Sequence, residues 1–157
     1  VALQPVAAGF ATYAMISAAS GWLAVAALIA VLSLLPEGPP IGPGAAFGAL
    51  AVGAIAVMLR GLEARRRGWA AREHDLIYRR GLIWQRTVVM PYARIQHVET
   101  ASGPLERAFG LLRLQCFSAG GSAADLVVAG LERETALRIR ALMLEHIRED
   151  DDDGISD

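Results

Sequence analysis

Two long runs without a charged residue constrain this chain more than any other feature. The first covers residues 1–36 and the second covers residues 38–59. A helix needs about 20 mostly apolar residues to cross the hydrocarbon core of a bilayer. The first run supplies a helix over residues 8–35, which a stretch rich in Pro and Gly ends. The second supplies a helix over residues 41–59, or about 28 Å at 1.5 Å per residue, which is just enough to span.

Two other interpretations of these runs are a cleaved signal peptide and a buried hairpin in a soluble protein. A signal peptide begins with a basic segment, which is not found before the first run, and apolar sequence continues well past the cleavage-like residues 24–26. A soluble hairpin would need a larger protein around it, because only about 80 residues of ordinary domain sequence remain. The sequence therefore predicts a transmembrane hairpin over residues 1–60, with the lipid bilayer as its partner.

Arginines set the expected orientation of this hairpin. Those that flank the end of the second helix are Arg60, Arg65, Arg66, Arg67 and Arg72. The loop at residues 36–44 carries only Glu37. Because loops rich in Arg and Lys stay in the cytoplasm, both termini and the domain that follows the hairpin are expected there. The chain is then a multi-pass protein of the cytoplasmic membrane.

Small residues recur at intervals of four within the hairpin. The pairs are Gly44 with Gly48, Ala49 with Gly53, and Ser17 with Gly21. Such spacings let membrane helices approach closely. Packing within the hairpin is the first expectation, and a dimer interface is the alternative. No ionisable residue lies in either run, which argues against a transporter or a channel.

The rest of the chain alternates short β-prone runs with turns and ends in one helix. A basic linker over residues 61–72 leads to a domain over residues 73–148. The expected strands are 75–80, 82–90, 95–100, 112–117 and 125–129, with turns at Gly81 and at Gly120-Gly121 and one helical turn at 104–109. After Gly130 one helical stripe is formed by Ala136, Ile139, Leu142, Met143, His146 and Ile147. Residues 149–157 hold six acids and no base, which predicts a disordered acidic tail.

Several segments of this domain carry a family resemblance. GL at 81–82, PYARIQHVE at 91–99, GPLER at 103–107 and FGL at 109–111 resemble the bacterial pleckstrin-homology-like (PH-like) domains of the YdbS-like, membrane-flanked family. The resemblance covers nearly the whole chain, because members of that family typically place two membrane helices before the domain and one helix at its end. It implies a mainly-β bent sandwich or barrel capped by the last helix. The segment at 116–120 departs from the Thr-Ala-Gly sequence usual in the family but keeps the turn.

No residue pattern predicts catalysis. The three histidines, His74, His97 and His146, lack the spacing of a metal site, and Cys116 is the only cysteine. Neither a nucleophile motif nor a phosphate-binding loop occurs in the sequence. The few basic and aromatic residues of the domain are not enough for a nucleic-acid surface. We therefore expect no enzyme activity, cofactor, metal, nucleic acid or small-molecule substrate.

Two binding functions remain, and assembly is the first expectation. In it the domain joins its own copies or a companion membrane-flanked protein, through Arg94, Gln96, His97, Glu106 and Arg107. Arg94 and Arg107 have a structural alternative, which is pairing with Glu99, Glu106 or backbone carbonyls. The second function is sensing of anionic lipid headgroups at the inner leaflet, through Arg79, Arg80 and Arg86 with the juxtamembrane arginines. For Arg65, Arg66 and Arg67 the simpler alternative is a signal that sets topology alone.

Overall fold

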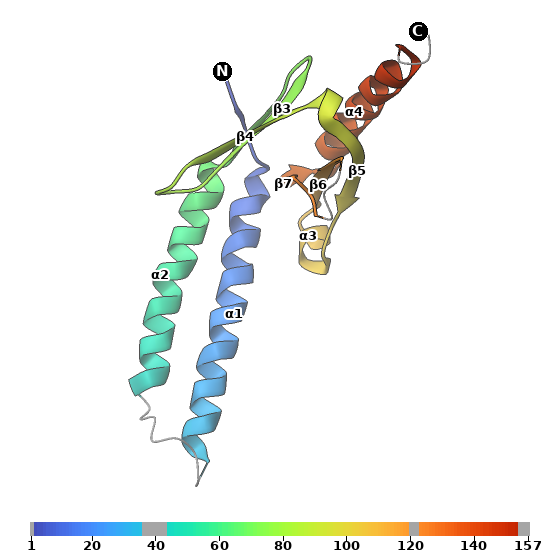
Figure 1. Ribbon diagram of the computed structural model, residues 1–157. Coiled ribbons are helices and arrows are strands. Elements are labelled where there is room, and N and C mark those ends of the chain that lie inside the picture. The colour runs from blue at the N-terminus through green and yellow to red at the C-terminus, as the bar shows by residue number, and fades with distance from the viewer. Residues whose placement is uncertain (1, 36–43, 120–122, 154–157) are drawn as a thin grey trace.

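The computed structural model of the protein describes residues 2–35, 44–119 and 123–153, and it consists of a long helical hairpin joined to a β-rich body (Figure 1). The hairpin is formed by α1 (Ala8–Leu34) and α2 (Gly44–Arg66). Both helices are long and apolar enough to cross a membrane, and only 6% and 11% of their apolar windows are buried. A helix that is apolar all round belongs either in a large core or in lipid. The exposure of these two helices excludes the soluble buried hairpin.

Close packing within the hairpin depends on two glycines. A Cβ atom at Gly53 would lie 2.8 Å from Cβ of Trp22, and one at Gly61 would lie 2.7 Å from the sulfur of Met15. Gly48, in contrast, has no described atom within 4 Å of such a Cβ position, and neither has Gly44. The expectation of packing within the hairpin is therefore correct for Gly53 and wrong for the GxxxG pair, because that pair faces away from α1.

The hairpin does not precede the β-rich body but is inserted into its first sheet. Strand β1 (Gln4–Pro5) lies before α1 and pairs with β2 (Gly68–Ala71), which follows α2. The side-chain position of Gly68 lies 3.1 Å from Cβ of Leu3, so a larger residue there would crowd β1. The expected linker over 61–72 is wrong, because α2 continues to Arg66 and β2 begins two residues later. The expected membrane unit over 1–60 likewise includes a strand of the sheet.

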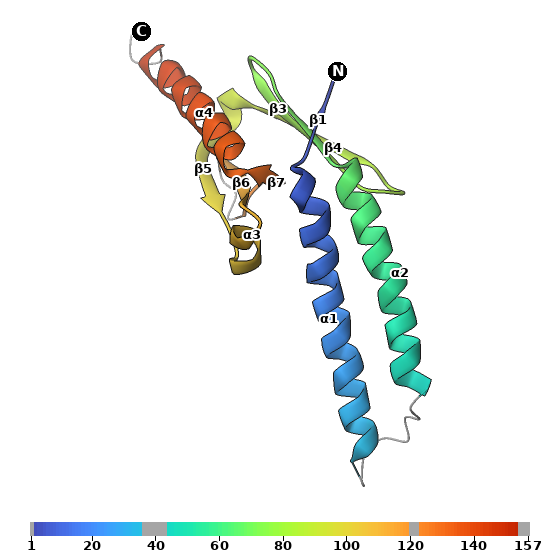
Figure 2. The ribbon, with the colours of Figure 1, turned by 180° about the vertical axis from the view of Figure 1, so that it is seen from behind.

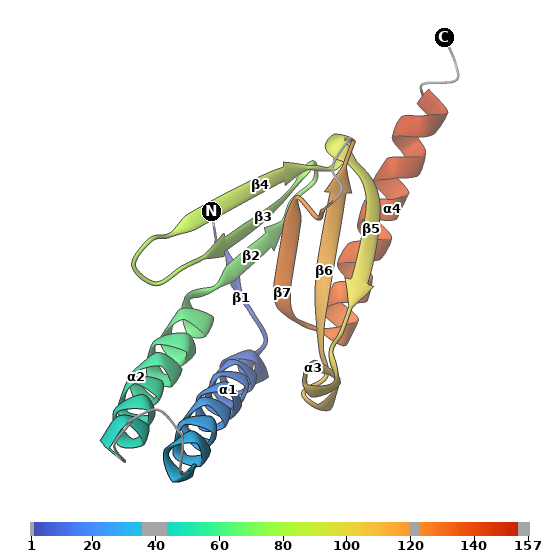
Figure 3. The same cartoon turned by 60° about the horizontal axis from the view of Figure 1, so that its bottom comes forward.

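Two antiparallel sheets form the β-rich body (Figure 3). The first has the order β1-β2-β3-β4, with β3 at Asp75–Arg80 and β4 at Arg86–Pro91. The second has the order β5-β6-β7, at Ile95–Ala101, Leu111–Ser118 and Leu126–Glu132. A short helical turn, η1 (Tyr92–Arg94), connects the sheets, and α3 (Pro104–Ala108) connects β5 to β6. The expected turn at Gly120-Gly121 lies outside the described residues.

The strand expected over 82–90 begins only at Arg86. Gly81 has a positive φ of 107°, and any Cβ atom there would collide with the carbonyl oxygen of Trp84. Only glycine adopts such a conformation readily. The chain therefore turns at Gly81 into a loop over 81–85 before β4 begins.

The carboxyl-terminal helix α4 (Arg133–Asp153) packs on the second sheet and closes one side of the body (Figures 2 and 3). Ala136, Ile139 and Met143 are buried in the core, while Leu142 of the expected stripe is 44% exposed. Disorder from residue 149 was expected, but the helical backbone continues to Asp153 because nothing in 149–153 breaks its hydrogen-bond pattern. Residues 154–157 lie outside the described part of the chain, as do residues 36–43 of the expected loop with Glu37. The predicted combination of a membrane hairpin with a helix-capped PH-like domain is confirmed.

The core of this domain includes residues of the hairpin. Val6, Phe10 and Ala64 belong to the same buried cluster as Trp69, Leu114 and Met143. The backbone N–H of Ala7 donates a 2.8 Å hydrogen bond to the carbonyl of Gly130. A Cβ atom at Gly130 would lie 2.5 Å from the ring of Phe10, so glycine is required for this contact. The hairpin and the domain consequently share one core.

Candidate functional site

Exposed arginines gather where the first sheet meets the end of α2. Arg65, Arg66 and Arg79 line a depression of about 260 Å³ together with Gln4 and Gln85. None of the three arginines forms an ion pair with a described carboxylate. Because these positive side chains have no described carboxylate partner, and because the guanidinium group matches the geometry of phosphate and carboxylate oxygens, the depression is suited to an anion.

Two further arginines lie at the same end of the sheet. Arg80 of β3 and Arg86 of β4 are directly opposite each other in the strand register, and both are exposed. Like charges at opposed positions of an antiparallel pair repel each other. An anion near the two side chains would relieve this repulsion. We call Arg65, Arg66, Arg79, Arg80 and Arg86 together the basic rim.

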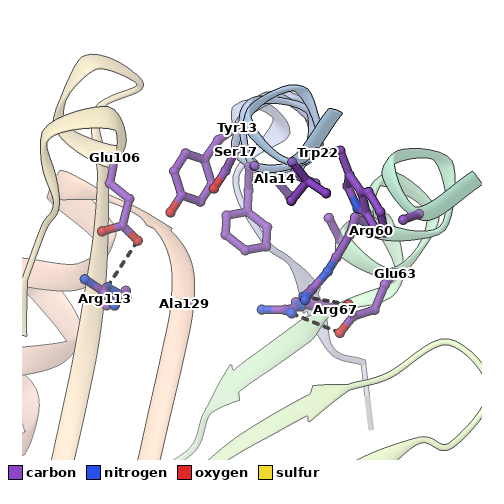
Figure 4. Close-up of a pocket in the computed structure, with 16 residues that line it drawn as sticks. Tyr13, Ala14, Ser17, Trp22, Arg60, Glu63, Arg67, Glu106, Arg113 and Ala129 are labelled. Carbon is purple, nitrogen blue, oxygen red and sulfur yellow. Dashed lines mark hydrogen bonds and ion pairs between the residues drawn. The ribbon is translucent and has the colours of Figure 1, made fainter. Parts of the chain in front are cut away.

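A larger cleft of about 770 Å³ lies between the hairpin and the second sheet (Figure 4). On the hairpin side, Arg67 holds several partners at once. Its guanidinium lies 2.9 Å from a carboxylate oxygen of Glu63, donates to the hydroxyl of Tyr78 at 3.3 Å, and lies 5.2 Å from the ring centroid of Phe10. Arg60 is weakly paired with Glu63, at 3.8 Å. Arg67 therefore fastens the base of α2 to α1 and to β3.

The opposite wall of the cleft contains a second ion pair. Glu106 is only 4% exposed, and its carboxylate lies 3.1 Å from Nε of Arg113. The other carboxylate oxygen accepts a 2.7 Å hydrogen bond from the backbone N–H of Gly103 at the start of α3. Both acids of the cleft are thus neutralised by arginines. The cleft is therefore a joint between the hairpin and the domain. It is a weaker candidate for binding an anion than the basic rim.

The residues predicted for assembly do not form one site. Arg94, Gln96 and His97 are exposed at the start of β5, whereas Glu106 and Arg107 belong to α3 beyond its other end. The His97 ring is 3.0 Å from the Glu99 carboxylate and lies beside Phe117. Glu106 pairs with Arg113, which is not among the partners considered from the sequence. The residues expected to form an assembly surface are therefore divided between the two ends of β5.

Of the five arginines predicted to flank the membrane, four lie at the end of α2 and Arg72 lies away from it. Arg60, Arg65, Arg66 and Arg67 belong to the end of α2 or follow it directly. Arg72 follows β2, which leads away from the hairpin, and its guanidinium lies 3.7 Å from the carboxylate of Asp75 at the start of β3. The first-sheet geometry thus places Arg72 at the far end of β2. Arg79 and Arg80 take its place near α2, although they are more distant in sequence.

The titratable groups with perturbed pKa values lie away from the basic rim. Burial raises the pKa of the Cys116 thiol to about 11, and burial followed by the charge of Asp75 raises the pKa of Tyr92. The hydroxyl and backbone N–H of Ser118 both donate to Asp125, which lowers the pKa of that carboxyl. Within the described residues, no group of three or more His, Cys, Asp and Glu side chains is placed to hold a metal ion.

Comparison with known proteins agrees with this architecture. The bacterial PH domain family matches residues 6–147, a range that includes the hairpin as well as both sheets and most of α4. The chain belongs to this family. It is also similar to the transmembrane protein YdbS of Bacillus subtilis (strain 168), with 31% identity over 85 residues. That region covers 54% of this chain and 52% of YdbS, so the chain spans about half the length of this relative. No solved structure matches the chain significantly.

Sequence reasoning missed how this bacterial PH domain unites its basic residues. The juxtamembrane and strand arginines were predicted to serve one lipid-binding function, but their meeting in space was not predicted, and the pairing of Gly68 with Arg79 brings them together. The β2–β3 turn at residues 72–74 brings the end of β3 back beside the start of β2, and sequence analysis did not predict β2 as a strand. No sequence pattern predicts the Glu106–Arg113 ion pair, because it joins two different elements, α3 and β6.

Proposed function

We propose that this protein is a non-catalytic, membrane-anchored PH-like module whose basic rim binds anionic phospholipid headgroups of the inner leaflet. The observation that carries the proposal is the depression at Arg65, Arg66 and Arg79, where three exposed arginines meet without a carboxylate partner among the described residues. Arginine matches the geometry of phosphate oxygens and retains its charge at any physiological pH. Membership of a family of membrane-associated PH domains is consistent with such a role.

The orientation supports an inner-leaflet site. Arginine-rich segments next to membrane spans stay in the cytoplasm, and the end of α2 has four arginines between Arg60 and Arg67. Because β1 pairs with β2, the chain before α1 and the chain after α2 are on the same side of the bilayer. The proposed location is the cytoplasmic membrane, with both termini and the PH-like domain in the cytoplasm.

The surface charge of the inner leaflet is the energetic basis of the proposal. An arginine close to an anionic leaflet contributes about 1 kcal/mol of attraction, which falls off within a Debye length of about 8–10 Å. Arg65 and Arg66 end the membrane helix itself, and Arg79 lies next to them across the β2–β3 pair. These side chains are therefore held within that range of the headgroups. Binding would depend on the fraction of anionic lipid and on salt.

Assembly becomes the second candidate, and a different part of the molecule supports it. The motif residues that were expected to form its surface are divided between the two ends of β5. The GxxxG pair of α2, however, faces outward within the described structure and is free to approach another helix. Small residues at this spacing are typical of close helix contacts in lipid. The partner that this geometry fits is a second copy of the hairpin.

The test of lipid binding requires the full chain, because Val6 and Phe10 are part of the domain core. The purified protein in detergent would be exposed to equal amounts of phosphatidylglycerol and phosphatidylcholine, and bound lipid would be measured by native mass spectrometry. We expect selective retention of phosphatidylglycerol. The double variant Arg66→Gln/Arg79→Gln should lose about 2 kcal/mol of binding free energy, or about 30-fold in affinity.

A matched control carries the same change in net charge elsewhere. Arg133 and Arg138 are exposed on α4, and the variant Arg133→Gln/Arg138→Gln should keep the selectivity of the wild type. Equal retention of the two lipids by the wild-type protein would refute the proposal. An equal loss of selectivity in both double variants would show that only net charge matters and would exclude a defined site.

A further inference from the structure

The β3–β4 loop exposes large apolar side chains that the body of the domain does not cover. Ile83 is 78% exposed and Trp84 is 86% exposed, the highest exposed fraction of any large apolar residue described in the structure. The loop projects beside α2, on the side away from α1 (Figures 1 and 2). Two exposed side chains of this size are costly in water and indicate an apolar partner.

The depth of the loop identifies the partner. Leu82, Ile83 and Trp84 line a shallow groove together with Ala56, Leu59 and Arg60 of α2. Leu59 is the last residue of the charge-free run, and Arg60 is the first charged residue after it. If α2 spans a bilayer, this boundary marks the level where hydrocarbon gives way to headgroups. The loop tip therefore lies at that level, on the outer face of the hairpin, where lipid surrounds the helices.

We infer that the Leu82–Ile83–Trp84 loop is inserted into the inner-leaflet interface of the same bilayer that the hairpin crosses. Tryptophan is enriched at this depth because its ring is apolar while its N–H can reach water or headgroups. Arg80 and Arg86 border the loop on its two strands, where they face the headgroup region. The positive φ of Gly81 holds the turn that directs the loop toward the membrane.

The insertion fixes the domain at two points relative to the bilayer. The hairpin base is one, through the shared core around Phe10, and the loop is the other. The inference requires a membrane-spanning hairpin but no preference for anionic lipid, because burial of an apolar tip does not depend on headgroup charge. It can therefore fail or hold independently of the proposed headgroup site.

The test follows the fluorescence of Trp84 in the reconstituted full-length protein. The signal of this residue is the difference between the wild type and the Trp84→Phe variant, since Trp22 and Trp69 contribute to both. Vesicles made only of phosphatidylcholine would contain lipid brominated near the top of the acyl chains. We expect the difference signal to be quenched by the brominated lipid and protected from aqueous iodide. The control Trp84→Phe/Glu73→Trp moves the tryptophan to the exposed β2–β3 turn, where iodide should quench it fully.

Each other outcome overturns the inference. If iodide quenches Trp84 as strongly as the transferred tryptophan, the loop is in water. If Trp84 is protected from iodide but is insensitive to brominated lipid, a protein surface covers the loop. Insertion in phosphatidylcholine combined with no selectivity for phosphatidylglycerol would support this inference and refute the headgroup site alone.

Discussion

Replacing Phe10 by Ala should weaken the PH-like domain, although Phe10 belongs to the first turn of a membrane helix. The ring is 4% exposed and packs against Gly130 of β7, Tyr13 and the guanidinium of Arg67. Removal of a buried Phe side chain typically costs about 3–5 kcal/mol, because burial is lost and a cavity remains. The free energy of unfolding of the domain should therefore fall by about this amount.

The single cysteine provides the assay. Cys116 is fully buried in β6, and burial raises its pKa to about 11, so its thiol reacts with an alkylating reagent only when the domain opens. The rate of labelling near neutral pH then measures the population of the open form. A loss of 3–5 kcal/mol predicts labelling about 10²- to 4 × 10³-fold faster in Phe10→Ala than in the wild type.

The matched control is Phe47→Ala on α2. Phe47 is 73% exposed in the described structure and faces the space that lipid would occupy, so its loss should change the labelling rate little. If Phe10→Ala and Phe47→Ala label Cys116 at the same rate, the hairpin and the domain do not share a core.

Two other changes test the cleft and the outward face of α2. Glu106→Ala removes the acceptor of Gly103 and the partner of Arg113 and should cost about 2–3 kcal/mol of domain stability, measured by urea unfolding. Glu106→Gln retains an acceptor and should reduce the domain stability less than Glu106→Ala does. If both variants lose the same stability, the charge of Glu106 alone is responsible for its contribution. Gly48→Val should reduce cross-linked dimers in membranes, whereas Ala54→Val, on another exposed face of α2, should not. Assembly through α2 is excluded if dimers are absent from the wild type or persist in Gly48→Val.

The sequence by itself determined the features that depend on local pattern. Charge-free runs of sufficient length can only be stable in lipid or in a large core, so the hairpin followed from the chain between residues 1 and 59. Alternating strands and the stripe of Ala136, Ile139 and Met143 likewise predicted a sheet domain closed by a helix. In each case residues that are neighbours in sequence are also neighbours in space, so the periodicity of the sequence is enough to predict the element.

Tertiary structure alone decided which distant segments meet. Gln4 and Pro5, which precede the hairpin, form too short a segment to be predicted as a strand from the sequence. Their pairing with β2 nevertheless inserts the hairpin into the sheet. The register of β2 with β3 unites Arg79 with Arg65 and Arg66, and it leaves Arg72 at the opposite end. These outcomes depend on strand pairing and shared burial between segments far apart in the chain. No local pattern encodes such contacts, because their stability depends on both partners at once.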